Sequence, residues 1–363
     1  MIIVACIILA FTLVQLLVAL MNLLPGASLP QAEDMHYERV SVLIPARNEE
    51  SNIRTLLNDL LKQQYKDIEI IVYDDQSDDN TTAIVKELAL TESRIFLLCG
   101  GSLPDGWLGK NHACHVLAQK ATGRYLLFLD ADVRISDNTI GKVVALAKKH
   151  RIALISIFPK QVIVSPGERI TVPNMNYILL TLLPLILVRR SWFSSLSAAN
   201  GQFMFFDSGV YRIHQPHLLM KKEKVEDIFI ARYLKKMGYK TACLTGDEGI
   251  ACRMYNGFRE AVSGFSKNVI AFFGSSFTAA VLFWLITTFG FIPVLYSFPP
   301  SLICVYFGAY ILTRIFVSAA SRQNIFFNLI FIIPLQLSMG FFIYNAFINK
   351  HFRKFQWKGR NIA

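Results

Sequence analysis

The sequence predicts an α/β domain with a mostly parallel sheet, attached to transmembrane helices. Between residues 36 and 267, apolar runs of strand length alternate with amphipathic runs of helix length. This alternation implies parallel strands joined by right-handed crossovers. Long apolar stretches without a charged residue flank that region, and 53% of the 363 residues are hydrophobic. The mean hydropathy of +0.40 is too high for a purely soluble domain, so we expect membrane association.

The α/β pattern can be followed element by element. A first β-rich run ends at Pro45, and the apolar positions Ile53, Leu56 and Leu60 then follow helical spacing. Similar runs predict five strands, at residues 40–44, 68–72, 94–98, 125–129 and 152–158. The segments between and after them predict helices at residues 49–64, 82–90, 112–120 and 139–150.

Three charge-free stretches predict the membrane-embedded parts. Residues 2–24 are long enough for one span, for which about 20 apolar residues suffice. They lack a basic leader and a small-residue cleavage site, so we expect residues 1–26 to form an uncleaved anchor. The runs 268–313 and 323–349 predict a C-terminal transmembrane region over residues 268–349.

The basic residues favour a membrane partner over a nucleic acid. The net charge is +11, but no nucleic-acid-binding motif accompanies it. Residues 350–363 predict a basic cytoplasmic tail beside anionic lipid, because they contain Lys350, Arg353, Lys354, Lys358 and Arg360. The six cysteines form no C-x-x-C pair, which argues against a zinc site or a disulfide framework.

One apolar segment inside the α/β region stands apart. Residues 176–188 contain Pro184, end at Arg189-Arg190 and are too short for a secure span. A helix lying in the membrane interface fits this pattern. An ordinary buried helix is the alternative.

Two acidic clusters follow predicted strands. Asp74 and Asp75 come after the second strand, and Asp130 and Asp132 after the fourth. The carboxyl ends of parallel strands border the crevice where open α/β sheets bind ligands. A divalent cation that holds a diphosphate would relieve the repulsion between such carboxylates. The clusters predict a nucleotide-diphosphate enzyme with Mg²⁺ or Mn²⁺ on Asp132 and Asp130, although a lone D-x-D also occurs by chance in solvated turns.

A further acidic pair, Glu226-Asp227, is a candidate for the base. Transfer from a nucleotide-diphosphate sugar to an alcohol or acid needs a base for the acceptor and cationic help for the leaving group. The alternative is an acidic pair at a helix N-terminus, stabilised by the helix dipole.

Several of these motifs resemble the family-2 inverting glycosyltransferases. Residues 40–50 (VSVLIPARNEE) look like the first strand and loop of that family, and residues 74–81 (DDQSDDNT) resemble its D-D-G-S-x-D-x-T turn. The D-A-D triplet at 130–132 resembles its metal-binding triplet. The E-D pair at 226–227 matches a pair whose aspartate is the catalytic base in the family.

Other segments resemble a membrane-bound branch of the family. Residues 107–114 (WLGKNHAC) are similar to its G-K-(S/N)-x-A-C segment, and residues 253–255 and 264–268 also resemble it. Residues 356–360 (QWKGR) look like the W-K-G-R ending of the carotenoid glycosyltransferases that act on diaponeurosporenoate or hydroxychlorobactene. The resemblance extends over residues 40–360.

The resemblance implies a GT-A type, Rossmann-like domain with a set of site residues. Asp227 would be the catalytic base, with Glu226 beside it. Asn200, Gly201 and Gln202 are expected in the acceptor wall. The donor would be bound by Pro45, Asn48, Glu49, Asp74, Asp75, Lys110, Asp130 and Arg253.

Two departures from the family pattern matter. Gln76 stands where the motif has glycine, so we expect an altered turn, since glycine tolerates positive φ at little cost. The Q-x-x-R-W motif of the processive branch is absent, which argues against a polysaccharide synthase. We assign Arg253 to the diphosphate because arginine suits such oxyanions. The alternative for Arg253 is a positive flank before the membrane.

The expected function is transfer of a hexose, glucose from UDP-glucose, to a lipid such as a carotenoid hydroxyl or carboxylate. A nucleotide sugar is cytosolic, so a multi-pass protein of the cell membrane should carry this domain on its cytoplasmic face. A hopanoid, ceramide or diacylglycerol acceptor stays open. The rival class, a non-catalytic membrane scaffold, is disfavoured by the presence of both Asp132 and Asp227.

The number of C-terminal crossings follows from charge. Three crossings would place the basic tail outside, against the positive-inside tendency, whereas two would place it inside. With two crossings, residues 302–320 must lie in the interface or re-enter. Arg314 favours this, because an arginine at the centre of a span costs roughly 2.5–3.5 kcal/mol.

Overall fold

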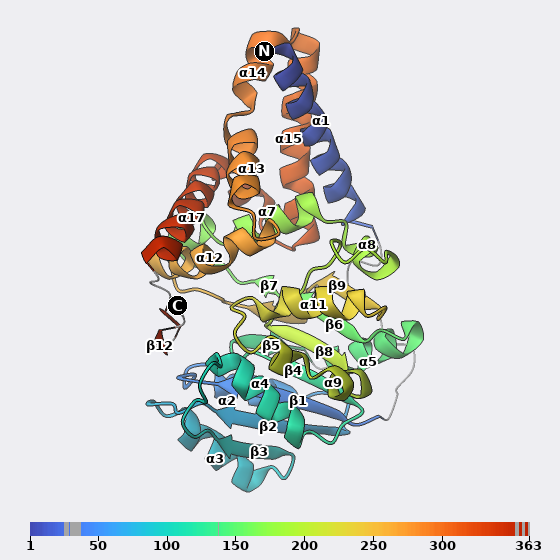
Figure 1. Cartoon of the computed structure of the whole chain (residues 1–363), viewed down its shortest axis with the longest axis vertical. Helices are drawn as coiled ribbons and strands as arrows, with labels where there is room; N and C mark the ends of the chain where they lie inside the picture. The colour runs from blue at the N-terminus through green and yellow to red at the C-terminus, as the bar shows by residue number, and fades with distance from the viewer. Residues whose placement is uncertain (25–28, 30–37, 137, 353–355, 358–359, 362–363) are drawn as a thin grey trace.

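Figure 1 shows an α/β domain joined to a bundle of long helices at one end. The structure is a computed structural model that describes residues 1–24, 29, 38–136, 138–352, 356–357 and 360–361. The start of the predicted domain at residue 36, the end of the predicted anchor at residue 26 and the basic side chains of the predicted tail lie outside what it describes.

The centre of the α/β domain is a seven-stranded sheet in the order β3-β2-β1-β4-β8-β6-β9. Its strands are β1 (Val40–Ala46), β2 (Ile68–Asp74), β3 (Ile95–Cys99), β4 (Tyr125–Leu129), β6 (Leu154–Phe158), β8 (Phe203–Asp207) and β9 (Thr241–Thr245). The five predicted strands are confirmed and run parallel to one another. β8 was not predicted, and it pairs antiparallel with both β4 and β6.

Helices cover both faces of this sheet (Figure 1). The predicted helices correspond to α2 (Ile53–Leu61), α3 (Thr81–Thr91), α4 (Gly109–Lys120) and α5 (Thr139–His150). The apolar face of α2 is fully buried at Ile53, Leu56 and Leu60, as its spacing predicts. α4 begins three residues earlier than expected, so Lys110 lies in its first turn.

Shorter elements complete the domain. They are β5 (Val133–Ile135), β7 (Lys160–Gln161), β10 (Ile250–Cys252), α6 (Pro166–Arg169), α9 (Ser208–His214), α10 (Pro216–Leu219) and α11 (Glu226–Lys236), with β11 (Gln356–Trp357) and β12 (Arg360–Asn361) near the C-terminus. β5, β10 and β7 form a second, three-stranded sheet.

Three of the described helices are long and apolar enough to cross a membrane: Ile2–Met21, Pro300–Ala320 and Ile332–Asn349. α12 (Phe258–Phe272) and α13 (Phe277–Phe289) pass the same test as a pair bent by 106°. The three candidate spans belong to α1 (Ile2–Met21), α15 (Pro300–Ala320) and α17 (Ile332–Phe352), and the shorter helices α14 (Phe291–Ser297) and α16 (Ile325–Ile330) lie at the same end. Large apolar side chains are exposed along it, including Ile3 at 72% and Ile333 at 71%. An exposed apolar surface of this kind, on helices long enough to span a bilayer, is consistent with membrane association.

Residues 302–320, expected in the interface or in a re-entrant segment if two crossings follow the domain, form a regular helix. They belong to α15, a continuous helix that stands beside α1 instead of lying across the base of the bundle (Figure 1). The penalty assigned to Arg314 assumed contact with lipid. Arg314 is only 3% exposed, its guanidinium carbon lies 3.6 Å from the ring centroid of Tyr177, and its Nη2 donates to the Tyr310 hydroxyl at 3.3 Å.

The segment 176–188 lies where the bundle meets the domain. It is divided between α7 (Pro173–Leu182) and α8 (Leu185–Arg190), with most of the α7 side chains buried. Asn22, just after α1, ties this junction together. Its Nδ2 donates to the carbonyls of Leu180 and Leu183, and its Oδ1 accepts from the amide of Leu185. The end of α1 is thereby fixed to the turn between α7 and α8.

Candidate functional site

An acidic cavity of about 290 Å³ lies at the carboxyl end of β4, where the sequence predicted a crevice. Its carboxylates come from two places in the chain: the turn after β4, which carries Asp130 and Asp132, and the start of α11, which carries Glu226 and Asp227. A second cavity of about 420 Å³ adjoins it on the side of β1 and shares Lys110, Asp130 and Asp132 with it. We call this one the β1-side cavity.

Lys110 supplies the positive charge that the clustered carboxylates require. Its Nζ lies 2.8 Å from Asp130, 3.9 Å from Glu226 and 3.3 Å from the carbonyl oxygen of Gly201. Burial by itself would lower the pKa of Lys110, but the charges of Asp130 and Glu226 outweigh it and raise that pKa. Lys110 is therefore a permanent cation at the centre of the acidic cavity.

Asp227 is held so that it can still accept a proton. Its Oδ2 accepts from the amide of Gly201 at 2.8 Å and its Oδ1 from the amide of Ile228 at 2.8 Å. An ionised carboxylate has about four lone-pair sites, so these bonds leave two to face the cavity. Burial raises the pKa of Asp227 above its ordinary value. Burial and the neighbouring charge of Asp227 also raise the pKa of Glu226, to about 7.

Asn200, Gly201 and Gln202, which are expected in the acceptor wall, line the acidic cavity. The amide of Asn200 donates to the Ser156 hydroxyl at 2.7 Å, and the amide of Gln202 donates to Asn200 Oδ1 at 2.8 Å. A Cβ on Gly201 would lie 3.1 Å from Lys110 Nζ and 3.3 Å from Glu226 Oε1. Glycine therefore allows the backbone to approach the charged groups closely.

Asp132 has an oxygen atom that fits a cation. Its Oδ1 is buried without a hydrogen-bond partner, and Gln202 donates to its Oδ2 at 3.4 Å. Burial, Asp130 and Glu49 raise the pKa of Asp132 to about 7. In the described part of the chain, no group of three or more His, Cys, Asp or Glu side chains is arranged to hold a metal ion. Magnesium sites usually complete their ligand shell with substrate phosphates and water, so one or two carboxylates fit such an ion.

The loops after β1 and β2 form one connected wall. The amide of Asn48 donates to the Ser77 hydroxyl, and Asn48 Oδ1 accepts from the amide of Asp78. Gln76 keeps a positive φ of 56°, so the chain retains there the left-handed conformation that glycine would favour. Of the predicted donor residues in these loops, Pro45 and Glu49 line the β1-side cavity.

Asp74 and Asp75 lie behind that wall and do not line either cavity. Both side chains are buried. Asp74 Oδ2 accepts from the Thr82 hydroxyl at 2.7 Å, whereas its Oδ1 is buried without a partner. Asp74 therefore retains the capacity to accept one more hydrogen bond.

Arg253 is not brought to the site. Its Nη2 lies 2.9 Å from Oε1 of Glu168, a fully buried carboxylate, and it lines neither cavity. Glu168 caps its own helix by accepting from the Val164 amide and the Ser165 hydroxyl. In this structure an ion pair with Glu168 engages the guanidinium of Arg253, so its assignment to a diphosphate stays a prediction.

The sequence analysis missed cavity residues that come from α12 and from the chain before it. Lys267 and Tyr255 line both cavities, and Lys224 lines the acidic one. A Cβ on Gly264 would lie 2.2 Å from the Tyr255 hydroxyl, so glycine is needed where the tyrosine crosses the helix. The available signal was the resemblance of residues 253–255 and 264–268 to the membrane-bound branch, since these segments contain Tyr255 and Lys267.

The sequence model of Glycosyl transferase family 2 matches residues 41–226, slightly more than half of the 363 residues. The chain belongs to glycosyltransferase family 2. The matched segment of this family-2 chain begins in β1 and ends at Glu226, so it contains the loops, the D-A-D triplet and the wall described above.

Curated relatives of the family-2 chain share part of its length. A 4,4'-diaponeurosporenoate glycosyltransferase of Staphylococcus haemolyticus (strain JCSC1435) is 27% identical over 241 residues, which cover 64% of this chain and 61% of the relative. The protein of the same name from Staphylococcus aureus (strain MRSA252) is 32% identical over 100 residues, covering 28% of this chain and 25% of the relative. The chain thus matches about three fifths of the length of the first relative and a quarter of the second.

A solved structure supports the fold of the family-2 chain over nearly its whole length. It is a mannosyltransferase from Pyrobaculum calidifontis in complex with GDP-mannose and Mn²⁺, with a TM-score of 0.57 and 17% sequence identity. The alignment covers 97% of this chain and 99% of that chain. The predicted GT-A type of α/β domain is confirmed.

Proposed function

We propose that this chain is a membrane-bound inverting glycosyltransferase that moves a hexose from a UDP-sugar to the hydroxyl or carboxylate of a lipid. The observation that carries the proposal is the acidic cavity. Asp227, which accepts only two backbone hydrogen bonds, lines it together with Lys110 and with Asp132, whose Oδ1 has no hydrogen-bond partner. The names of the curated relatives favour a carotenoid acceptor. Glucose from UDP-glucose is the proposed donor.

The β1-side cavity is the proposed donor site. Pro45 and Glu49 lie along it, and the wall behind it contains Asn48 and the unpartnered oxygen of Asp74. A carboxylate there can accept a hydrogen bond from the uracil N–H or a ribose hydroxyl. Asp75 would support this wall from within, because its amide donates to the carbonyl of Ala46 at 2.8 Å.

Asp132, with Asp130 beside it, is the proposed holder of Mg²⁺ or Mn²⁺. Such an ion would neutralise charge on the departing diphosphate. Asp130 also pairs with Lys110 at 2.8 Å, so the lysine and the ion would share this carboxylate. We assign leaving-group stabilisation to Lys110 and Lys267, which line both cavities, in place of Arg253.

The acceptor would reach Asp227 through a third, apolar cavity of about 160 Å³ under α7. This apolar cavity shares Phe158, Met175, Ala199 and Phe272 with the acidic cavity, so the two are contiguous. Its outer wall includes Leu182, which is 38% exposed at the end of α7. Each CH₂ kept out of water is worth about 0.8 kcal/mol, so a lipid acceptor would keep its chain in this apolar path.

Leu182→Asp tests the acceptor route. We expect it to lower transfer to a lipid acceptor at least about tenfold, because a charge at the mouth of an apolar path opposes passage of the chain. Donor hydrolysis and UDP binding should stay within about twofold. Leu218→Asp is the matched control, since Leu218 is also 38% exposed and lines none of the three cavities. Equal loss of transfer and hydrolysis in Leu182→Asp would mean that α7 is ordinary core at this position.

The proposed orientation places the α/β domain in the cytoplasm. Nucleotide sugars are made there, and the helices α1, α13–α14 and α15 rise from one end of the domain (Figure 1). In this arrangement α13–α14 and α15 cross the membrane, whereas α7, α12 and α17 lie near its cytoplasmic surface. The basic chain after α17 then lies on the cytoplasmic side, as the positive-inside tendency favours.

The direct test is transfer of label into lipid. The full chain in nanodiscs should move label from radiolabelled UDP-glucose into the organic phase when given a carotenoid carboxylic acid or a hydroxylated carotenoid. A diacylglycerol or ceramide that accepts label faster would reassign the acceptor but keep the reaction. Label that appears only as free glucose, or not at all with any of these lipids, would contradict the proposed function.

A further inference from the structure

A basic pocket of about 500 Å³ lies on another side of the domain, between α8, the end of α5 and the start of β9. Its lining residues include Arg189 and Arg190 from α8 and His150 from α5. None of them lines the acidic, β1-side or apolar cavity. The basic pocket is therefore separate from the proposed transfer site.

Five basic side chains line this pocket and no acidic residue does: His150, Arg189, Arg190, Lys235 and Lys240. Lys235 is already engaged, because its Nζ donates to the carbonyls of Val188 and Leu196. Among the described residues, no carboxylate forms an ion pair with Arg189, Arg190 or Lys240.

The cations in the basic pocket disfavour one another. Burial and the neighbouring charge of Arg190 lower the pKa of Arg189. Burial, Arg189, Lys149 and Lys240 lower the pKa of His150. A bound anion would oppose the repulsion between these groups, because an opposite charge within a few ångströms favours the protonated form of each group.

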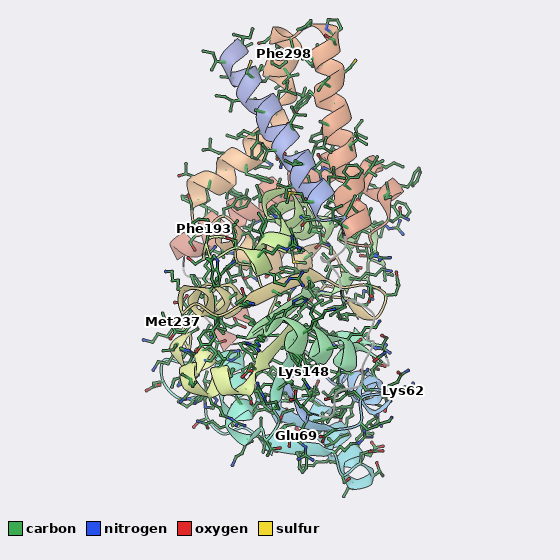
Figure 2. All side chains as sticks on the ribbon, turned by 90° about the vertical axis from the view of Figure 1, so that its right-hand side faces the viewer. Lys62, Glu69, Lys148, Phe193, Met237 and Phe298 are labelled. Atoms are coloured by element: carbon green, nitrogen blue, oxygen red, sulfur yellow. The ribbon has the colours of Figure 1, made fainter. Side chains whose placement is uncertain are left out.

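The position of the pocket points to the surface of a membrane. α8 lies at the level where α1 ends, and Asn22 joins that end to the turn before α8 (Figure 1). Trp192 and Phe193, which follow α8 directly, are 74% and 73% exposed. Figure 2 shows Phe193 at the boundary between the helical bundle and the α/β domain. Exposed aromatic rings beside arginines are typical of the headgroup region of a bilayer.

We propose that the basic pocket binds the phosphate of an anionic phospholipid headgroup and so docks the α/β domain against the membrane. Arg189 and Arg190 contact the phosphate oxygens, since a guanidinium donates two parallel hydrogen bonds to such groups. Trp192 lies against the glycerol region of the same lipid. This binding does not depend on which sugar or acceptor the chain uses.

The test uses the full chain in a neutral detergent, titrated with phosphatidylglycerol and followed by native mass spectrometry. We expect one saturable lipid, which phosphatidylcholine does not displace. Arg189→Gln combined with Arg190→Gln should weaken binding about 25-fold, from about fivefold for each lost charge near an anionic surface. Lys62→Gln combined with Lys86→Gln is the control. Both lysines are exposed and lie outside every cavity named here, and this pair of substitutions removes the same total charge as the arginine pair.

Three outcomes would overturn the proposal: no saturable lipid, equal weakening in the variant and the control, or soluble glycerol 3-phosphate binding as tightly as phosphatidylglycerol. The last would assign the pocket to a free phosphate instead of a lipid. If the double variant does not fold, Arg190→Gln alone decides, because Arg190 is exposed and its loss should still weaken binding about fivefold.

Discussion

Replacing Asp227 by asparagine should reduce transfer to a hydroxylated acceptor by about 10²–10⁴-fold, because the variant loses the group that takes the acceptor proton. Donor binding should be retained, since an asparagine Oδ1 can still accept one of the two backbone amides. The measurement is turnover with a hydroxylated lipid, alongside UDP-sugar binding. Asp67→Asn is the matched control, because Asp67 is exposed and pairs with Arg39 far from the cavity. Near-normal turnover by purified Asp227→Asn would refute the assignment.

The size of that loss should depend on the acceptor. A carboxylic acid is already ionised at neutral pH, so its attack needs no base, and the same substitution should cost much less. The pH dependence of transfer to an alcohol should likewise report whether Asp227 is ionised and able to act as the base. Because burial raises the pKa of Asp227, transfer to an alcohol should fall as the pH drops and begin to fall at a higher pH than an exposed aspartate would give. An equal loss with both acceptor classes would mean that Asp227 positions the acceptor instead of deprotonating it.

Removal of the divalent cation should abolish transfer. Chelation in the presence of UDP-sugar should lower the rate at least about 100-fold, since such an ion stabilises several kcal/mol of transition-state charge and about 1.4 kcal/mol corresponds to tenfold. Mg²⁺ or Mn²⁺ should restore it. Asp132→Asn should show the same loss and a higher requirement for metal, because Asp132 contributes the unpartnered oxygen.

The free protein should bind the ion weakly, because its carboxylates would need the donor phosphates to complete the site. This can be measured by calorimetry with Mn²⁺ alone and then with UDP. Full activity after exhaustive chelation would exclude the proposed role of Asp132, and a normal metal requirement in Asp132→Asn would move the ion elsewhere.

The sequence was sufficient to predict the parallel half of the fold. β1, β2 and β4 are buried runs of strand length bounded by turns, and their alternation with amphipathic helical runs predicts a parallel sheet. β8 was missed because the run Phe203–Asp207 is short and apolar, and periodicity cannot distinguish such a run from a buried helix. Its antiparallel direction depends on pairing with β4 and β6, which no local pattern encodes.

The part of the candidate site that directly follows predicted strands could be predicted from the sequence. Residues directly after strands, such as Asp130 and Asp132, could be placed because strand ends meet at one edge. Arg253 could not, because its ion pair with Glu168 joins residues 85 positions apart. The burial of Arg314 could not be predicted, because its covering ring, Tyr177, belongs to another helix.

The place of β8 in the sheet has a consequence for how the chain is made. β4 and β6 are synthesised before β8, yet β8 separates them, so β6 has no neighbouring strand in the main sheet when it leaves the ribosome. A nascent chain that stops before Phe203 carries open strand edges, which are sites of aggregation. Gly201 precedes β8 and Asp227 follows it, so translation through α11 fills the gap between β4 and β6 and brings Asp227 to the amide of Gly201, before β9 and Lys267 are made.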